Sequence, residues 1–318
     1  MTELINTEFY KQHGFSEIRR INAGFSGDEK YCVKTDSGER FLVKLFAKKT
    51  ENAIKIKAER MTKMADAGVP MARFVSYELC GDGRIISFYT WCDGDLVSDL
   101  LRKQSVEQSH ELGLQAGRVL YKIHSVPVEY EPFRVHVFIK RRVRRALEIF
   151  ESLGISEPLM DSLALYFKNK DLEFLKERRG CLIHTDYHTA NITYSKKNGV
   201  QIIDWNDIHY SDPLSDLAYV YDAAKFDGGF RSFASGLLHG YLEGGHEEDF
   251  GDVFSFFFGL KVFDLTARGL RNHVGNEKRI AVRTKSNYSA LNWFDTQCGL
   301  KEFGFSDEIT EEIKKRGV

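Results

Sequence analysis

The segment His184-Thr-Asp-Tyr-His-Thr-Ala-Asn191 and the Asp204 that follows it decide the fold of this chain. A histidine precedes an aspartate by two residues, and an asparagine follows that aspartate by five. The apolar runs 192–194 and 200–203, separated by an Asn-Gly turn, predict a β-hairpin after the asparagine. Because this hairpin begins beside Asn191 and ends beside Asp204, we expect both side chains at the same edge of a sheet.

These residue types suit the transfer of a phosphoryl group. Asp186 is placed to take the proton from a substrate hydroxyl, which is worth roughly 10²- to 10⁴-fold in rate. Asn191 and Asp204 offer the hard oxygen ligands that Mg²⁺ prefers. Taken singly, each residue could equally cap a helix, hold a turn or bond a backbone carbonyl. The joint spacing, with His184 at its start, is typical of the catalytic loop and metal aspartate of kinases.

The N-terminal third contains a glycine turn before two strands, at 31–33 and 41–46. The turn carries Gly24, Ser26 and Gly27, whose backbone N–H groups and hydroxyl could contact a phosphate. Two glycines alone also fit an ordinary hairpin turn. The sequence therefore predicts a nucleotide-binding turn only in combination with the catalytic segment.

Lys44 is a single cation inside an apolar strand and needs an anionic partner there. Glu59 is the acid in the interior of the following helix, whose apolar positions run from 54 to 65. A strand lysine paired with a helix glutamate holds the lysine at nucleotide phosphates in protein kinases. A surface lysine and an unrelated glutamate remain the alternative.

Two further strands are predicted, at 74–79 and 84–89, and the chain then crosses to a second lobe at 90–94. A hinge of this kind offers backbone groups to the edge of a base. We predict an N-terminal nucleotide-binding lobe at 1–91 and a C-terminal catalytic and substrate-binding lobe at 92–318. The latter includes a core helix around 112–123.

Composition indicates a cytoplasmic globular protein. The 318 residues are 42% hydrophobic and 29% charged, with a formal charge of -1. The five cysteines are odd in number and contain no Cys-x-x-Cys pair, which favours reduced thiols over disulfides or zinc. The longest apolar run, 253–263, is too short for the roughly 20 residues of a membrane span and predicts a buried helix. The basic run 140–145 lacks interleaved aromatic residues, so a solvated helix face is favoured over a nucleic-acid site.

Three motifs resemble the aminoglycoside phosphotransferase and choline kinase-like family. That family has His-Gly-Asp-x-His-x-x-Asn, then Ile-Asp-Trp or Ile-Asp-Phe, then Gly-Asp-Pro-x-x-Asp-Leu-Ala. This chain has the segment 184–191, then 203–205, then Ser211-Asp-Pro-Leu-Ser-Asp-Leu-Ala218. Thr185 and Ser211 stand where the family has glycine. The short interval before the last motif, and the absence of Ala-Pro-Glu, argue against a protein kinase.

The resemblance implies an α+β, bilobal protein kinase-like fold. Its small N-lobe would be rich in β-strands with one main helix, and its larger C-lobe would be mostly helical. It also implies an enzyme that uses Mg²⁺ and ATP or GTP. The implied roles are catalytic base (Asp186), metal ligands (Asn191, Asp204), backbone contacts to the base (Thr90, Cys92) and structural supports of the loop (His184, Asp216).

The acceptor is the least determined part. Between 204 and 264 there are twelve acids and three basic residues, which suits a polycationic acceptor such as an aminoglycoside antibiotic. Asp222 and Asp264 are the candidate ligands. An amino-alcohol or sugar kinase is the alternative, with an aromatic box from Tyr219, Tyr221 and the Phe cluster 254–258. A nucleotide-binding pseudokinase is the alternative of another class. We expect no nucleic-acid or membrane partner.

Overall fold

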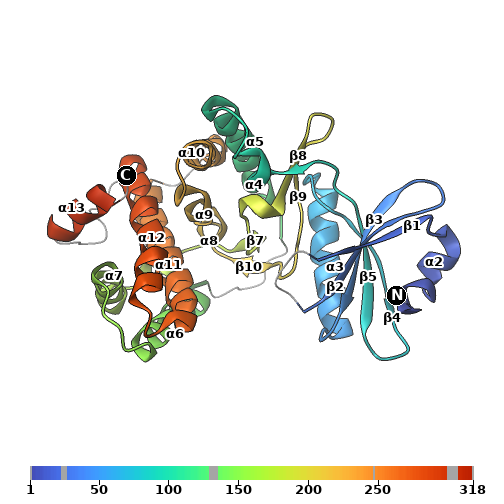
Figure 1. The fold of residues 1–318 in the computed structure, drawn as a ribbon, viewed down its shortest axis with the longest axis horizontal. Helices are drawn as coiled ribbons and strands as arrows, with labels where there is room; N and C mark the ends of the chain where they lie inside the picture. The colour runs from blue at the N-terminus through green and yellow to red at the C-terminus, as the bar shows by residue number, and fades with distance from the viewer. Residues whose placement is uncertain (1, 23–26, 129–134, 246–247, 299–306, 317–318) are drawn as a thin grey trace. The chain divides into compact units, whose positions relative to one another are not determined.

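The structure, a computed structural model, describes residues 2–22, 27–128, 135–245, 248–298 and 307–316 (Figure 1). The chain divides into two compact units. The N-terminal unit comprises Met1–Gly94 and Thr193–Ile208, and the C-terminal unit comprises Asp95–Ile192 and His209–Val318. The first division lies three residues beyond the predicted lobe boundary.

The segment Thr193–Ile208 joins the N-terminal unit, although the lobe boundaries predicted from the sequence assign it to the C-terminal lobe. Its backbone explains this placement. Ala72 donates its N–H to the carbonyl of Ile202 at 3.0 Å, and Ile202 donates its N–H to the carbonyl of Pro70 at 2.9 Å. These bonds fix the outgoing arm of the hairpin, and with it Asp204, to the chain that leaves the first long helix.

A five-stranded antiparallel sheet in the order β1-β2-β3-β5-β4 forms most of the N-terminal unit. A hairpin of two short strands and three helices complete the unit. The bounds are β1 Glu17–Ile21, β2 Glu29–Lys34, β3 Arg40–Phe46, β4 Phe74–Leu79, β5 Ile85–Thr90, β8 Ile192–Ser195, β9 Gly199–Ile202, α1 Thr2–Ile5, α2 Glu8–His13 and α3 Glu51–Asp66.

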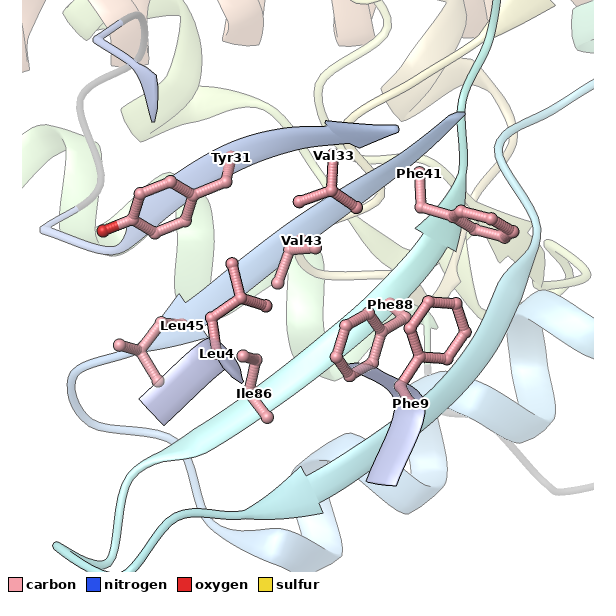
Figure 2. Close-up of a cluster of buried hydrophobic side chains, with 9 residues drawn as sticks. All are labelled: Leu4, Phe9, Tyr31, Val33, Phe41, Val43, Leu45, Ile86 and Phe88. Carbon is pink, nitrogen blue, oxygen red and sulfur yellow. The ribbon is translucent and has the colours of Figure 1, made fainter. Parts of the chain in front are cut away.

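One face of the sheet is covered by the N-terminal helices, as Figure 2 shows. Phe9 of α2 stacks on Phe88 of β5 with ring centroids 4.2 Å apart and meets Phe41 of β3 edge-on at 5.1 Å. Leu4 of α1 and Val43 of β3 belong to the same buried cluster. Burial of side chains of this size stabilises by about 1.5–3 kcal/mol each, which anchors β3, the strand of Lys44.

The helix α3 buries one stripe, formed by Ile54, Lys57, Met61 and Met64. Thr50 caps its N-terminus by accepting the N–H of Ala53. The stripe follows the 3.6-residue period of a helix, and the remaining residues of α3 are exposed or half-buried. A lysine within a buried stripe is unusual, because lysine is almost never fully buried without a partner.

The C-terminal unit is mostly helical. It contains two short strands, β7 Cys181–Ile183 and β10 His209–Ser211, which pair antiparallel, and the two-residue β6 Asp95–Leu96. The helices are α4 Val97–Leu100, α5 Val106–His124, α6 Val135–Ser152, α7 Pro158–Asn169, η1 Glu173–Lys176, η2 Thr189–Asn191, α8 Leu214–Leu217, α9 Val220–Ala224, α10 Gly229–Leu242, α11 Phe250–Leu270, η3 Arg271–His273, α12 Glu277–Gln297 and α13 Asp307–Arg316.

The helices α5 and α10 approach each other at backbone distance (Figure 1). Gly113 and Gly117 on α5 meet carbonyl groups of α10, and Gly236 and Gly240 on α10 meet carbonyl groups of α5. A Cβ atom at Gly236 would lie 2.1 Å from the carbonyl oxygen of His110. The two glycine pairs, each spaced by four residues, therefore set the separation of this helix pair.

The helix α11 forms the centre of the C-terminal unit and is buried around its whole circumference over the predicted run 253–263. Its phenylalanines pack against aromatic residues of α7 and α12, for example Phe256 on Phe167 at 5.7 Å and Phe258 on Phe294 at 4.5 Å. Within the described residues, no helix is long and apolar enough to cross a membrane.

Candidate active site

The loop that follows β7 is held by the buried carboxylate of Asp216. Asp216 accepts the backbone N–H groups of His184 at 2.5 Å and Thr185 at 2.7 Å, and His124 Nε2 lies 3.4 Å from it. Burial opposes ionisation of this carboxyl group, but the bonds from His124 and the backbone lower its pKa below the usual value. An ionised aspartate thus fixes the start of the loop.

Thr185 adopts a left-handed backbone conformation, with a φ of 76°. A β-branched residue pays a steric cost there that glycine does not pay. The position is the one at which the related motif has glycine. The conformation turns the chain sharply between His184 and Asp186, and the bond from the Thr185 N–H to Asp216 maintains it.

Asp186 presents its carboxylate at the surface of the C-terminal unit. The side chain is 45% exposed, and Oδ2 accepts Nδ2 of Asn191 at 3.0 Å and lies 3.3 Å from Nε2 of His188. Burial acts to raise the pKa of Asp186, but His188, and more weakly His184 and Asn191, outweigh it and lower the pKa. The carboxylate is therefore ionised at neutral pH and free on one side to accept a proton.

Asn191 uses its amide nitrogen within the loop, where Nδ2 also donates to the carbonyl of Asp186 at 3.0 Å. In the part of the chain that the structure describes, no donor is hydrogen-bonded to its Oδ1. This oxygen fits a hard cation such as Mg²⁺. No group of three or more His, Cys, Asp or Glu side chains that could hold a metal occurs among the described residues.

Lys44 finds its anionic partner in Asp204. Its ammonium group donates to Oδ1 of Asp204 and, at 2.9 Å, to Oδ1 of Asn206. The ammonium of Lys30 lies 3.6 Å from Oδ2 of the same carboxylate. Although burial favours the neutral acid, the two lysines lower the pKa of Asp204 to about 2. Asp204 is thus an ionised carboxylate on the N-terminal unit, with a left-handed φ of 62°.

The predicted pair of Lys44 and Glu59 is wrong for this structure. Glu59 is exposed, and the carboxylate bound by Lys44 is that of Asp204. The reason is helical phase: at about 100° per residue, Glu59 lies about 170° around α3 from the centre of the buried stripe. The residue that α3 turns towards the sheet is Lys57.

The other predicted nucleotide contacts are only partly described. Gly24 and Ser26 lie outside the described residues, and Gly27 faces open space. The N–H of Thr90 is bonded to the carbonyl of Arg73 at 2.9 Å, which leaves its carbonyl as the group for a base. The N–H of Cys92 has no acceptor within the described part. The proposed contacts of these residues with a nucleotide remain proposals.

The two predicted acceptor ligands differ in availability. Asp264 is 3% exposed and its carboxylate binds Arg142, at 3.1 Å, and Arg268, so its charge is already matched inside the fold. Asp222 is 37% exposed and pairs with Lys225 at 2.7 Å. It lines a cavity of about 630 Å³ in the C-terminal unit and is the better placed of the two.

The predicted aromatic box of Tyr219, Tyr221 and the Phe cluster 254–258 does not present open ring faces to a quaternary ammonium acceptor. The ammonium of Lys261 lies 3.3 Å from the ring centroid of Tyr219, and that of Lys225 lies 4.9 Å from the ring centroid of Tyr221. The phenylalanines of α11 are core residues. Internal cations therefore occupy the faces of both tyrosines, which the count of aromatic residues in the sequence could not reveal.

Three polar residues in the neighbourhood of Lys44 were not predicted from the sequence: Lys30, Lys57 and Asn206. Lys30 had a signal, because it alternates with the apolar positions of its strand and pairs across the sheet with Lys44. Lys57 also had one, since it shares a helical face with Ile54 and Met61. Asn206 stands where the related motif often has an acid, and only the structure shows its bond to Lys44.

A family model described as "Phosphotransferase enzyme family" matches residues 17–250. The chain belongs to this family. No curated protein matches the sequence significantly. Among solved structures, APH(2'')-IIIa with GDP and kanamycin is 16% identical, with 100% of this chain and 98% of that chain covered and a TM-score of 0.63.

Two further solved structures extend the likeness. A thermostable mutant of the aminoglycoside phosphotransferase APH(4)-Ia is 14% identical, with coverages of 94% and 99% and a TM-score of 0.64. The amicoumacin kinase hAmiN, in complex with AMP-PNP, Ca²⁺ and amicoumacin, is 15% identical, with coverages of 84% and 87% and a TM-score of 0.59. The predicted family and the protein kinase-like fold are confirmed, and the chain is a phosphotransferase.

Proposed function

We propose that this phosphotransferase moves the γ-phosphate of ATP or GTP to a hydroxyl group of a small molecule, with Mg²⁺ as the metal ion. The observation that carries the proposal is the Asp186 carboxylate. It is ionised, it is oriented by His188 and Asn191, and nearly half of its side chain is exposed. A general base needs each of these three properties to reach an acceptor hydroxyl.

The chain's own residues divide the work in this proposal. Asp186 orients the acceptor hydroxyl and receives its proton as the new O–P bond forms. Lys44 binds phosphate oxygens of the donor, and the backbone of Thr90 and Cys92 contacts its base. Asn191 and Asp204 would hold Mg²⁺, which when bound would supply positive charge to stabilise the charge that develops on the phosphate. The metal-ligand role of Asn191 fits the unbonded Oδ1, and that of Asp204 fits its pKa of about 2.

For the acceptor we propose an aminoglycoside-like antibiotic, so that the enzyme would act in the cytoplasm as a resistance kinase. Similar folds are found with kanamycin and with amicoumacin bound. Asp222, at the cavity in the C-terminal unit, is the proposed contact for an amino group. A sugar or amino-alcohol kinase is the second candidate, but the occupied faces of Tyr219 and Tyr221 speak against choline-like acceptors.

The Asp186→Asn variant tests the mechanism. The amide keeps the shape of the side chain but cannot accept the proton, so we expect kcat to fall by roughly 10²- to 10⁴-fold. Nucleotide affinity should change little, because no donor contact is assigned to Asp186. The measurement is Mg²⁺-dependent phosphate transfer from ATP and GTP to a panel of aminoglycosides, amino alcohols and sugars, with nucleotide titration in parallel.

The outcomes separate the candidates. Full activity of Asp186→Asn would refute the base role. Transfer by the wild-type chain to sugars or amino alcohols alone would select the second candidate. Nucleotide binding without turnover on any acceptor would support a pseudokinase instead. The Asp222→Asn variant supplies the acceptor test, since a rise in KM for an aminoglycoside at unchanged kcat is expected if Asp222 binds it.

A further inference from the structure

Lys57 is buried in α3 without a carboxylate partner in the described part of the chain. It is 8% exposed. Its ammonium donates to the hydroxyl of Tyr89 at 3.0 Å and lies 4.7 Å from the ring centroid of Tyr89 and 5.5 Å from that of Phe46. A hydroxyl and two ring faces offer only partial negative charge, whereas a buried ammonium needs a full counter-charge or loses its proton.

Two more lysines belong to the same region of the N-terminal unit. Lys30 and Lys44 are cross-strand partners on β2 and β3, and both are buried. Like charges directly opposite each other destabilise a sheet unless an anion lies between them. The ammonium of Lys44 is 5.9 Å from the ring centroid of Tyr89, so Lys44 and Lys57 both lie close to this ring.

One carboxylate contacts two of these three ammonium groups directly, and none contacts Lys57 in the described part of the chain. Asp204 contacts Lys44 and Lys30, while Asp28, whose carboxylate accepts the N–H of Ala47 at 3.3 Å, acts on the lysines only through longer-range attraction. The region therefore carries more positive charge than its own acids neutralise.

A cavity adjoins Lys57. It has a volume of about 180 Å³ and lies between α3 and the segment that follows Asp204. Its polar lining is mostly basic or amide, formed by Lys49, Lys57, Arg60, Asn206 and Asp207. Asn206 connects the cavity to Lys44 through the 2.9 Å hydrogen bond. This volume corresponds to about six water molecules, which is space for part of a phosphate chain.

We propose that Lys57 is a phosphate-binding residue of this enzyme, and that Lys30, Lys44 and Lys57 together form a three-lysine pocket for the phosphate chain of the nucleoside triphosphate donor. The inference rests on the proposed function for the identity of the donor. When Asp204 turns to Mg²⁺ as proposed, Lys30 and Lys44 lose their direct counter-charge, and the phosphates replace it. Lys57 then supplies a positive charge from α3, the helix on which the sequence predicted Glu59 as a negatively charged partner of Lys44.

The test is nucleotide binding without acceptor, measured by calorimetry in Mg²⁺ buffer for the wild type, Lys57→Met and Lys57→Arg. The matched control is Lys63→Met, which removes an exposed lysine from the same helix. We expect Lys57→Met to lower the affinity for ATP at least 10-fold, the affinity for ADP by less, and the affinity for AMP by no more than about 2-fold. The loss should follow the number of phosphates because the charge of Lys57 acts on the phosphate chain. Lys57→Arg should retain most of the affinity, and Lys63→Met all of it.

Two results would overturn the proposal. One is unchanged ATP affinity in Lys57→Met. The other is an equal loss for ATP, ADP and AMP, which would indicate a packing role beside Tyr89. If Lys57→Met does not fold, Lys30→Met takes its place: it should show the same graded loss, and an ungraded loss or none would refute the three-lysine pocket.

Inorganic tripolyphosphate separates this inference from the proposed function. The wild-type chain should bind it, and Lys57→Met should bind it at least 10-fold more weakly. Tripolyphosphate binding that depends on Lys57, without any binding of ATP or GTP, would contradict the proposed donor and retain the anion pocket. Binding of ATP or GTP that does not depend on Lys57 would retain the proposed donor and contradict the three-lysine pocket.

Discussion

Thr185 and Asp204 are the non-glycine residues with positive φ in the described chain, and both belong to the site. Strain of this kind costs of order 1–3 kcal/mol and persists only where the surroundings enforce it. At Thr185 the enforcing group is Asp216, and at Asp204 it is the pair of lysines. Each unit thus retains an unfavourable backbone conformation next to a carboxylate, at Thr185 before Asp186 in one and at Asp204 itself in the other.

Replacing Thr185 by glycine should stabilise the protein by about 1 kcal/mol, because the relief of strain exceeds the entropy that glycine loses. The measurement is the denaturant midpoint at constant m-value. Thr185→Ala is the matched control, since alanine keeps the Cβ atom and the strain while losing the rest of the side chain. An equal gain in stability for alanine and glycine would show that backbone strain is not the cause.

At the scale of elements, the sequence predicts the location of strands and helices from apolar runs bounded by turn residues. The strand predicted at 74–79 is β4, and the strand predicted at 41–46 lies within β3. The buried run 253–263 lies within α11, because phenylalanines on every face leave a helix no exposed side. The pairing of Glu59 with Lys44 is wrong because the charge of a residue does not determine its side of a helix, and Glu59 lies opposite Ile54 and Met61 on α3.

Long-range partners could not be predicted from local pattern. The bond between Lys44 and Asp204 joins residues 160 positions apart, and local periodicity contains no information about such pairs. For the same reason, the count of acids between 204 and 264 overstates the negative charge that is available to an acceptor. Arg142 and Arg178 lie far earlier in the sequence but neutralise Asp264 and Asp212 inside the fold.

The close pairing of α5 and α10 predicts a sharp difference between two glycines. Gly236→Ala should cost about 1–3 kcal/mol despite the better helix propensity of alanine, because its Cβ atom would overlap the carbonyl of His110. Gly251→Ala, also helical but facing open space, should be neutral or stabilising by up to about 1 kcal/mol. Thermal unfolding of both variants checks the prediction, and equal effects would contradict the close approach.

At the scale of the whole molecule, ionised carboxylates make the free energy of unfolding depend on pH in the acid range. Asp204 has a pKa of about 2 in the fold, compared with 3.8 for its ordinary value, so the folded state binds the proton less readily than the unfolded state. Its contribution is fully present above about pH 4 and is lost as the pH falls through about 2. Asp186 and Asp216 also have lowered pKa values and act in the same direction.

We therefore expect the free energy of unfolding to be nearly constant from pH 7 to 5 and to fall steeply between pH 4 and 2. Asp204 alone should account for about 2 kcal/mol of that fall. The check is urea unfolding at several pH values for the wild type and Asp204→Asn. The variant, which cannot ionise at this position, should show a shallower acid dependence, and identical slopes for the two proteins would refute the assignment.

The N-terminal unit is assembled from two stretches of chain, and this has a consequence for its biogenesis. Residues 95–192, which separate the stretches, number 98, and ribosomes add about 5–20 residues per second. For about 5–20 s the nascent sheet therefore exists without Thr193–Ile208. During that interval Lys30, Lys44 and Lys57 lack Asp204. We therefore expect these lysines to repel one another until the second stretch is synthesised and Asp204 reaches Lys30 and Lys44.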